Sequence, residues 1–374
     1  MNKIKVAYII SNISKVIMFE WISNSLDRKK FELIFIFLNE TEPEVFNYLQ
    51  ENGFKCYLIR YRTKKDIPIS TIKVIRILFS NKIKILHAHL FDASLVGLLA
   101  AFILKIPKRI HTRHHSDFHH IYFPTAVKYD NLINWLSTDI IVISKNVFQL
   151  LIEKEKYVEG KIKLIYHGFD ISSFEKREEN KIISMQEKWK INPTAVKIGM
   201  VSRLIKWKGV DYAIEGFKKL YNENNNIQLI IANAKGEPDY VSYIHSLVEI
   251  LPKNTVIFID YENDMPTLYH SFSIFLHTPE DETCEAFGQV YIEAMAAKTP
   301  SVVTLSGIAV EYIEDRQQSL VVEFKSSDSI YEKLKEIIAD DALKTSLVDN
   351  GYQKVKSMFS LESMTKQLEK IYSE

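Results

Sequence analysis

The residue types that could do chemistry gather in the stretch 285–295. Glu285 and Glu293 stand there with seven residues between them, and Phe287-Gly288 lies in that interval. The acidic, turn-rich run before the stretch predicts a loop, and the apolar spacing from Gln289 onward predicts a helix. A helix start offers free N–H groups and a positive dipole end to a phosphate, and a glycine there lets a ligand approach the backbone. The two carboxylates would repel phosphate, so they suit hydroxyl groups instead.

Two cations that could meet a phosphate lie upstream of this stretch. Arg203 and Lys208 follow the predicted strand 196–201 and precede a predicted helix from Val210. Arginine presents a planar fork to phosphate oxygens, and lysine presents a point charge. Taken singly, Arg203 is better explained as a surface cation and Lys208 as a lysine that flanks a helix. Two cations for a diphosphate and two carboxylates for sugar hydroxyls together predict a nucleotide-sugar site.

The combination of Arg203, Lys208-Gly209 and Glu285-x-x-Gly288-x4-Glu293 resembles the donor site of retaining family 4 glycosyltransferases, the glycosyl transferases group 1. The resemblance runs through most of the chain. It implies a GT-B fold, in which two Rossmann-like, doubly wound domains face each other and a C-terminal helix crosses back to the first domain. Ligands of such sheets bind at the carboxyl ends of the strands.

The resemblance also implies roles for these side chains. Arg203 and Lys208 would hold the donor diphosphate and the charge left on it as the sugar departs. Glu285 would hold hydroxyls of the transferred sugar, and Glu293 would hold the ribose; the alternative for Glu293 is a solvated helix residue. Backbone N–H groups of residues 287–288 would lie near the sugar and the phosphate.

Histidines are concentrated in the first half of the chain, where seven of the eleven fall between His87 and His120. By resemblance, Thr112-Arg113-His114 matches a Thr-x-His pattern that places His114 near the reacting sugar, with His115 as the alternative. Imidazoles and the carboxylate of Asp117 are also metal-ligand types. Adjacent histidines on an extended segment point apart, however, so no metal site is expected.

Two family features are altered in this sequence. The loop after the first strand lacks the paired glycines of the family, but Ser14 and Lys15 could contact the donor through their side chains. Lys298 stands where a helix-ending glycine is common, and a left-handed lysine would cost about 1–2 kcal/mol. Neither change removes the residues of the predicted donor site.

Strand-like apolar runs alternate with helix-like segments along the whole chain, which predicts α/β doubly wound sheets. The pattern pauses over the polar stretch 175–197 and then restarts. We therefore expect an N-terminal acceptor-side domain over residues 1–175 and a nucleotide-sugar domain over 190–357. A last amphipathic helix over 358–374, with Ser360 as its N-cap, is expected to pack on the first domain.

The net charge of +1 is unevenly spread. Residues 1–170 hold 25 Lys+Arg and 16 Asp+Glu, whereas residues 171–374 hold 23 and 31. A basic half suggests anionic partners, and the segment 60–65 together with Arg109 and Arg113 favours an anionic membrane surface. The plain alternative is that the solvated faces of the two halves simply differ.

The sequence therefore predicts a retaining, metal-independent glycosyltransferase without a cofactor. It would use a nucleoside-diphosphate sugar to extend a glycan or lipid-linked glycan in bacterial-type surface polysaccharide or glycoconjugate assembly. A non-catalytic sugar-nucleotide-binding subunit, a sugar-nucleotide epimerase and a phosphorylase stay open as alternatives. A cytoplasmic location is expected, peripheral on the inner face of the membrane, because the longest apolar run, 93–104, is too short to span a bilayer. No nucleic-acid partner is expected.

Overall fold

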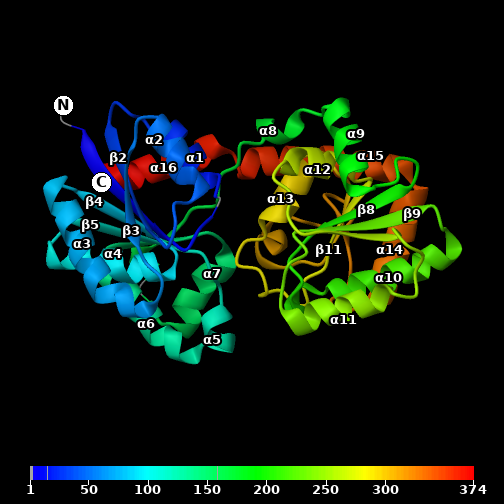
Figure 1. Ribbon diagram of the computed structural model, residues 1–374, viewed down its shortest axis with the longest axis horizontal. Coiled ribbons are helices and arrows are strands. Elements are labelled where there is room, and N and C mark those ends of the chain that lie inside the picture. Colours follow the sequence, from blue (N-terminus) through cyan, green and yellow to red (C-terminus); the bar gives the residue numbers. More distant parts are fainter. Residues whose placement is uncertain (1–2, 15, 158) are drawn as a thin grey trace. The chain divides into compact units, whose positions relative to one another are not determined.

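The computed structural model describes residues 3–14, 16–157 and 159–374 (Figure 1). Contacts divide the chain into two compact units, one of residues 1–169 with 359–374 and one of residues 170–358. We call them the N-terminal and C-terminal units. Each is built on its own parallel sheet, so the predicted α/β class with two doubly wound sheets is confirmed.

The N-terminal unit contains a seven-stranded sheet in the order β3-β2-β1-β4-β5-β6-β7. All of its pairings are parallel. The central strands are long apolar runs buried on both faces, as strands covered by helices on each side must be. The strands are β1 (Ile4–Ser11), β2 (Phe31–Asn39), β3 (Lys55–Arg60), β4 (Ile85–His89), β5 (Lys108–Arg113), β6 (Asp139–Val142) and β7 (Ile162–Leu164).

Alternate residues of these strands pack against helices on opposite faces of the sheet. Val6 and Tyr8 pack with side chains of α1 (Met18–Ser25), α2 (Glu44–Glu51) and α16 (Leu361–Ser373). Ala7 and Ile9 pack with side chains of α3 (Ile67–Ser80), α4 (Phe91–Ile103) and α6 (Val127–Leu136). The remaining short elements are η1 (Lys64–Asp66), α5 (Phe118–Tyr122), η2 (Pro124–Ala126), α7 (Lys145–Gln149), the π-helical turn η3 (Leu150–Lys154) and η4 (Glu159–Lys161).

The last helix, α16, belongs to the N-terminal unit although it is made from the end of the chain. The hydroxyl of Ser360 accepts a hydrogen bond from the Ser363 N–H at 3.2 Å, which confirms the predicted N-cap. Met364, Leu368 and Tyr372 are buried against the sheet. The predicted amphipathic helix therefore supplies part of the core of this unit.

The C-terminal unit contains a six-stranded parallel sheet in the order β10-β9-β8-β11-β12-β13. Its strands are β8 (Val196–Val201), β9 (Ile227–Ala232), β10 (Val256–Ile259), β11 (Ile274–His277), β12 (Ser301–Val303) and β13 (Leu320–Val321). Its helices are α8 (Ser172–Glu175), α9 (Glu179–Trp189), η5 (Lys206–Lys208), α10 (Val210–Glu223), α11 (Pro238–Val248), α12 (Met265–Ser271), α13 (Gln289–Ala296), η6 (Gly307–Glu311), α14 (Ser327–Ala339) and α15 (Asp341–Met358).

The strand order reverses once in each sheet. The reversal lies between β1 and β4 in the N-terminal unit and between β8 and β11 in the C-terminal unit. At such a point the loops that leave the two neighbouring strands run in opposite directions. The carboxyl ends of these strands therefore leave room for a ligand. The reversals therefore mark where each unit is best able to bind one.

Candidate active site

The loops that follow β8 and β11 are joined where the strand order of the C-terminal unit reverses. The Glu280 N–H donates to the Trp207 carbonyl at 3.0 Å, and the Thr278 hydroxyl donates to the Gly209 carbonyl at 3.1 Å. Gly209 has φ +63°, and a Cβ there would lie 2.1 Å from the Thr278 carbonyl oxygen. Only glycine fits this backbone, so the loop that carries Lys208 is held against the loop that carries Glu285.

The loop after β12 supports the same site from the other side. The Glu285 N–H donates to the Ser306 hydroxyl at 3.1 Å, and the Ile308 N–H donates to the Phe287 carbonyl at 2.8 Å. These bonds fix the path of residues 285–287 between the ends of neighbouring strands. Glu285 therefore occupies a rigid position.

Glu285 is buried among basic groups. Its Oε1 atom forms an ion pair with Lys208 Nζ and lies 3.1 Å from Nε2 of His277. Burial raises the pKa of the Glu285 carboxyl, but the charge of Lys208 and the contacts with His277 outweigh it and bring the pKa down to about 2. Glu285 is therefore an anion at neutral pH and suits the role of hydrogen-bond acceptor for hydroxyl groups.

The two predicted cations differ in their surroundings. The Lys208 side chain is only 13% exposed and its ammonium lies 4.7 Å from the centre of the Trp207 ring. Arg203 is exposed, and its side chain forms no ion pair with any of the residues that the structure describes. One cation is thus fixed by the protein, whereas the other can take an anionic partner from solution.

Glu293 lies within α13, as predicted, and is buried. The Tyr269 hydroxyl donates to its Oε2 atom at 2.8 Å, and the Gln289 amide donates to Oε1. Burial raises the pKa of the Glu293 carboxyl, which these two hydrogen bonds only partly offset. Because each carboxylate oxygen has a further lone pair, Glu293 can still accept a hydroxyl, and its ribose-binding role stays a prediction.

Residues 287–288 directly precede this helix. Phe287 is buried, and Gly288 has φ +88° at the N-cap of α13. The helix start expected after Gly288 is therefore present, with its N–H groups at the carboxyl end of the sheet. Contacts of these two residues with a donor stay a prediction.

His277 and Ser306 belong to the site although the sequence analysis did not identify them. His277 is fully buried at the end of β11, and burial lowers the pKa of its imidazole despite the hydrogen bond with Glu285. A histidine as the last residue of a predicted strand was an available signal. The sequence offers no such signal for Ser306, because the role of this residue depends on the path of a loop.

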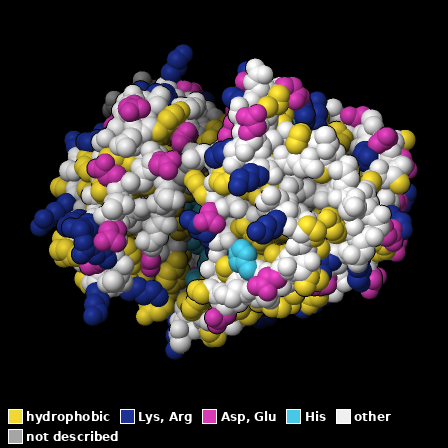
Figure 2. Space-filling model, turned by 45° about the vertical axis from the view of Figure 1, so that its right-hand side comes forward, with side chains coloured by type: hydrophobic (Ala, Val, Ile, Leu, Met, Phe, Trp, Pro, Cys, Tyr) yellow, Lys and Arg dark blue, Asp and Glu magenta, His cyan; other side chains and the backbone are white. Residues whose placement is uncertain are grey.

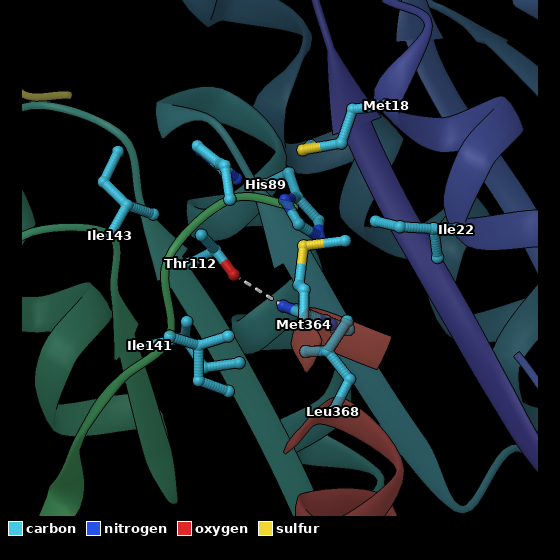
Figure 3. Close-up of a pocket in the computed structure, with 11 residues that line it drawn as sticks. Met18, Ile22, His89, Thr112, Ile141, Ile143, Met364 and Leu368 are labelled. Atoms are coloured by element: carbon cyan, nitrogen blue, oxygen red, sulfur yellow. Dashed lines mark hydrogen bonds between the residues drawn. The ribbon is translucent and has the colours of Figure 1, made fainter. Parts of the chain in front are cut away.

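The N-terminal unit holds a second group of polar side chains, at the ends of β4 and β5 (Figure 3). His87 lies 2.7 Å from the Thr112 hydroxyl and 2.6 Å from the Tyr372 hydroxyl. Nδ1 of His89 lies 3.0 Å from Nε2 of His114, and the His114 ring stacks on His167 with 5.3 Å between ring centres. A cavity of about 20 Å³ adjoins this cluster.

Burial keeps these histidines neutral. It lowers the pKa of His87 to about 3 and of His167 to about 4, and it lowers the pKa values of His89 and His114 well below their ordinary value. A group whose pKa is lower in the folded than in the unfolded state stabilises the fold fully above the unfolded pKa. That stabilisation is lost as the pH falls toward the folded pKa.

We therefore expect the melting temperature of the N-terminal unit to fall between pH 6.5 and pH 4.5. Each of these histidines lowers the free energy of unfolding by up to about 1.4 kcal/mol per pH unit in that interval. A His167→Asn variant should show a smaller fall, since it has one fewer buried imidazole to protonate. Thermal unfolding at a series of pH values tests this, and equal slopes in both proteins would contradict it.

Arg113 is not available to a membrane, and this part of the sequence analysis was wrong. Its side chain is fully buried, where NH2 donates to Glu155 at 2.8 Å and NH1 lies 3.5 Å from Asp130. Arg109 is half-buried, and its guanidinium donates to the carbonyls of Leu136 and Ile106 at 2.7 Å each. Both arginines therefore stabilise the interior of the unit.

His115, His119 and Asp130 have ligand atoms within 4.8 Å of one another and could hold a metal ion by their types and spacing. Asp117, considered from the sequence, is not one of the three. Burial raises the pKa of Asp130, but hydrogen bonds from the two histidines and the charge of Arg113 outweigh it, and the pKa falls below its usual range. The arginine already supplies a positive charge to this carboxylate, so a metal ion there would meet repulsion.

His114 and His115 both line a cavity of about 230 Å³ beside α5 and α6. His114 also contacts the histidine cluster, whereas His115 contacts Asp130 at 3.4 Å. The position of His114 near the reacting sugar, with His115 as the alternative, stays a prediction. Ser14 is exposed, and its carbonyl accepts from the Glu44 N–H, while Lys15 lies outside the described residues.

Lys298 has φ +57°, so the expected left-handed residue is present after α13. Among the residues that the structure describes, no helix combines the length and the apolarity that crossing a bilayer requires.

Comparisons with known protein families match nearly the whole chain. The model of the family described as glycosyl transferases group 1 matches residues 181–354, and that of glycosyltransferase family 4 matches residues 22–173. The capsular polysaccharide biosynthesis glycosyltransferase CapM of Staphylococcus aureus is 28% identical in an alignment that covers 83% of each chain. The alpha-monoglucosyldiacylglycerol synthase of Acholeplasma laidlawii is 23% identical over 78% of this chain and 75% of its own.

Solved structures show the same architecture. Anabaena HepE in complex with UDP-glucose superposes with a TM-score of 0.84 at 20% identity, and the match covers 99% of both chains. The sucrose-phosphate synthase of Thermosynechococcus elongatus superposes with a TM-score of 0.77 at 17% identity, over 99% of this chain and 98% of that one. These likenesses confirm the expected GT-B fold.

Proposed function

We infer that this chain, which belongs to the family 4 glycosyltransferases of group 1, moves a sugar from a nucleoside-diphosphate sugar to a glycan or lipid-linked glycan with retention of configuration. The observation that carries the proposal is the Lys208–Glu285 ion pair at the strand-order reversal of the C-terminal unit. It sets a cation for phosphate beside an anion for hydroxyls, where doubly wound sheets bind ligands.

The proposed chemistry needs no obligatory metal ion and no cofactor. Arg203, Lys208 and the start of α13 would neutralise the leaving diphosphate, which is the task of a divalent cation in other enzymes. Glu285 would hold hydroxyls of the transferred sugar. The acceptor would attack from the face that the diphosphate leaves, and a phosphate oxygen would take the proton of the acceptor. His114 would lie near the reacting sugar.

A uridine nucleotide is the first donor to consider, since HepE has been solved with UDP-glucose. CapM is named for capsular polysaccharide biosynthesis and the Acholeplasma relative for a glycolipid, which supports a surface-polysaccharide or lipid-linked acceptor. A peripheral position on an anionic membrane surface fits such an acceptor and the basic character of residues 1–170.

Nucleotide binding is the direct test of the proposed donor site. We expect UDP or UDP-glucose to raise the melting temperature of the protein by mass action. At a ligand concentration of a hundred times the Kd, binding adds about 2.7 kcal/mol to the free energy of unfolding. A chelator should leave the shift unchanged, because the cations come from the protein. ADP, GDP and their sugars serve as comparisons, and no shift with any nucleotide or nucleotide sugar would reject the site.

The alternative functions share this donor site and are separated by their products. An epimerase would release an altered nucleotide sugar and a phosphorylase a sugar phosphate. A non-catalytic binding subunit would bind the donor without turning it over, so slow hydrolysis of the bound donor in the absence of acceptor would exclude it.

A further inference from the structure

The layer of α3, α4, α5 and α6 exposes a large number of apolar side chains to solvent. Twelve of the nineteen large hydrophobic residues that are exposed in the described part of the chain lie on these four helices or directly after α5. Their exposed fractions range from 38% to 74%. We call this set the α3–α6 face: Ile69, Ile72, Phe79, Phe102, Ile103, Phe118, Ile121, Tyr122, Phe123, Tyr129, Leu132 and Trp135.

These side chains form connected groups. The Phe118 ring lies 5.3 Å from Tyr122 and 5.4 Å from Phe123, and the Phe102 ring of α4 lies 5.2 Å from Trp135 of α6. The helices α3 and α4 contact each other, as do α4 and α6. Single exposed hydrophobic residues are normal on a protein surface, whereas many of them on neighbouring helices, with aromatic rings in contact, indicate an interaction site.

The charged residues of the segment that carries these side chains are mostly basic. The segment 61–138 holds twelve Lys+Arg and four Asp, and it has no Glu. None of the four aspartates is exposed: Asp66 and Asp92 are half-buried, and Asp117 and Asp130 are buried. Nine of the basic residues are exposed: Arg62, Lys64, Lys65, Lys73, Arg76, Lys82, Lys84, Lys105 and Lys128. In Figure 2, Lys and Arg side chains of the N-terminal unit lie among hydrophobic ones.

We infer that the α3–α6 face docks on a membrane surface rich in anionic lipid, with the aromatic side chains of α5 and α6 inserted among the headgroups. Trp and Tyr favour that depth because one end of the ring is apolar and the other polar. Exposed Lys and Arg residues add about 1 kcal/mol each near an anionic surface. The inference specifies the membrane contact proposed above and does not depend on sugar transfer.

Other partners fit this face less well. A symmetric dimer would bring the same basic residues of two copies together, which like charges oppose. A nucleic acid would suit the cations and the aromatic rings, but aliphatic side chains such as Ile69, Ile72 and Leu132 cannot stack on bases. They gain free energy only in an apolar environment. Anionic lipid can both neutralise the basic residues and cover the exposed apolar side chains of this face.

The test is flotation of the full-length protein with vesicles of phosphatidylcholine, with and without about one third phosphatidylglycerol, at near-physiological salt. We expect binding to the anionic vesicles and little to the neutral ones. Combining Ile121→Ser, Phe123→Ser and Trp135→Ser should lower the vesicle partition coefficient by about tenfold or more, because each lost side chain removes apolar contact with lipid. The matched control is Ile250→Ser with Tyr261→Ser, two exposed apolar residues of the C-terminal unit, which should bind as the parent does.

The melting temperature and the nucleotide-induced shift should be unchanged in the triple variant, so a failure of the membrane inference can be told from a failure of the donor site. Equal flotation of parent and triple variant would overturn the inference, as would a parent that stays in solution with anionic vesicles. A parent dimer that the triple variant separates, in the absence of vesicle binding, would assign the face to self-association. Oligonucleotide binding in place of vesicle binding would assign it to nucleic acid.

Discussion

Replacing Lys208 with alanine is expected to lower turnover by a factor of about 100 or more, and Arg203→Ala should have a loss of the same order. A fixed cation that meets charge developing on a leaving group lowers the activation barrier by about 2.7–4 kcal/mol. Lys208 is such a cation, since it is nearly buried and is held by Glu285. Its removal also takes the ion pair away from the buried Glu285 carboxylate, which keeps its contact with His277.

Lys206 offers a matched control for this experiment. It lies in the same loop, but its ammonium pairs with Asp211 and Glu280 and its side chain is 54% exposed. Lys206→Ala should therefore keep turnover within a few-fold of the parent. Transfer from the preferred donor, measured beside melting temperatures, separates a lost charge from a lost fold. Near-parental rates in both Arg203→Ala and Lys208→Ala would reject the assigned site.

Replacing Arg113 with methionine is expected to reduce the free energy of unfolding of the N-terminal unit by about 3–5 kcal/mol. The side chains of Asp130 and Glu155 are 2% and 1% exposed, and the variant leaves both without their cation. Protonation would relieve a buried carboxylate, so its pKa in the folded variant should be raised. The loss should therefore be largest at neutral pH and smaller as the pH falls through that raised pKa.

An exposed ion pair provides the comparison for Arg113. Arg62 pairs with Glu40 at 2.9 Å, with exposed fractions of 52% and 59%. Arg62→Met should cost at most about 1 kcal/mol, as surface pairs do. Urea unfolding tests both variants, with a separate transition fitted for each unit. A similar small loss in the two variants would show that the buried network does not stabilise the unit.

Much of the architecture could be predicted from the sequence because its signals are local. Continuous apolar runs predicted the central strands, and most of the polar stretch 175–197 lies between β7 and β8. The helices α5 and α6 were among those not predicted, because the apolar residues of 118–135 do not follow one buried face. Many of those residues point to solvent, so the periodicity that identifies an ordinary amphipathic helix is absent.

A site residue could be predicted from the sequence only where its own chemical type indicated its role. Lys208 and Glu285 were predicted to belong to one donor site, and in the structure they form an ion pair. The burial of Arg113 could not be predicted, because the carboxylates that neutralise it come from α6 and from Glu155, the residue after η3, and no spacing rule connects those segments. Contacts between distant segments decide whether a charge is available to a ligand or belongs to the interior.

The place of α16 has a consequence for the order in which the protein is completed during synthesis. The Tyr372 hydroxyl of this helix contacts Tyr8 and His87 in the interior of a unit whose strands were translated hundreds of residues earlier. The C-terminal unit is one uninterrupted stretch, whereas the N-terminal unit needs the final turns of the chain. The ribosome therefore releases α16, which completes the core of the N-terminal unit, only after it has synthesised the whole C-terminal unit.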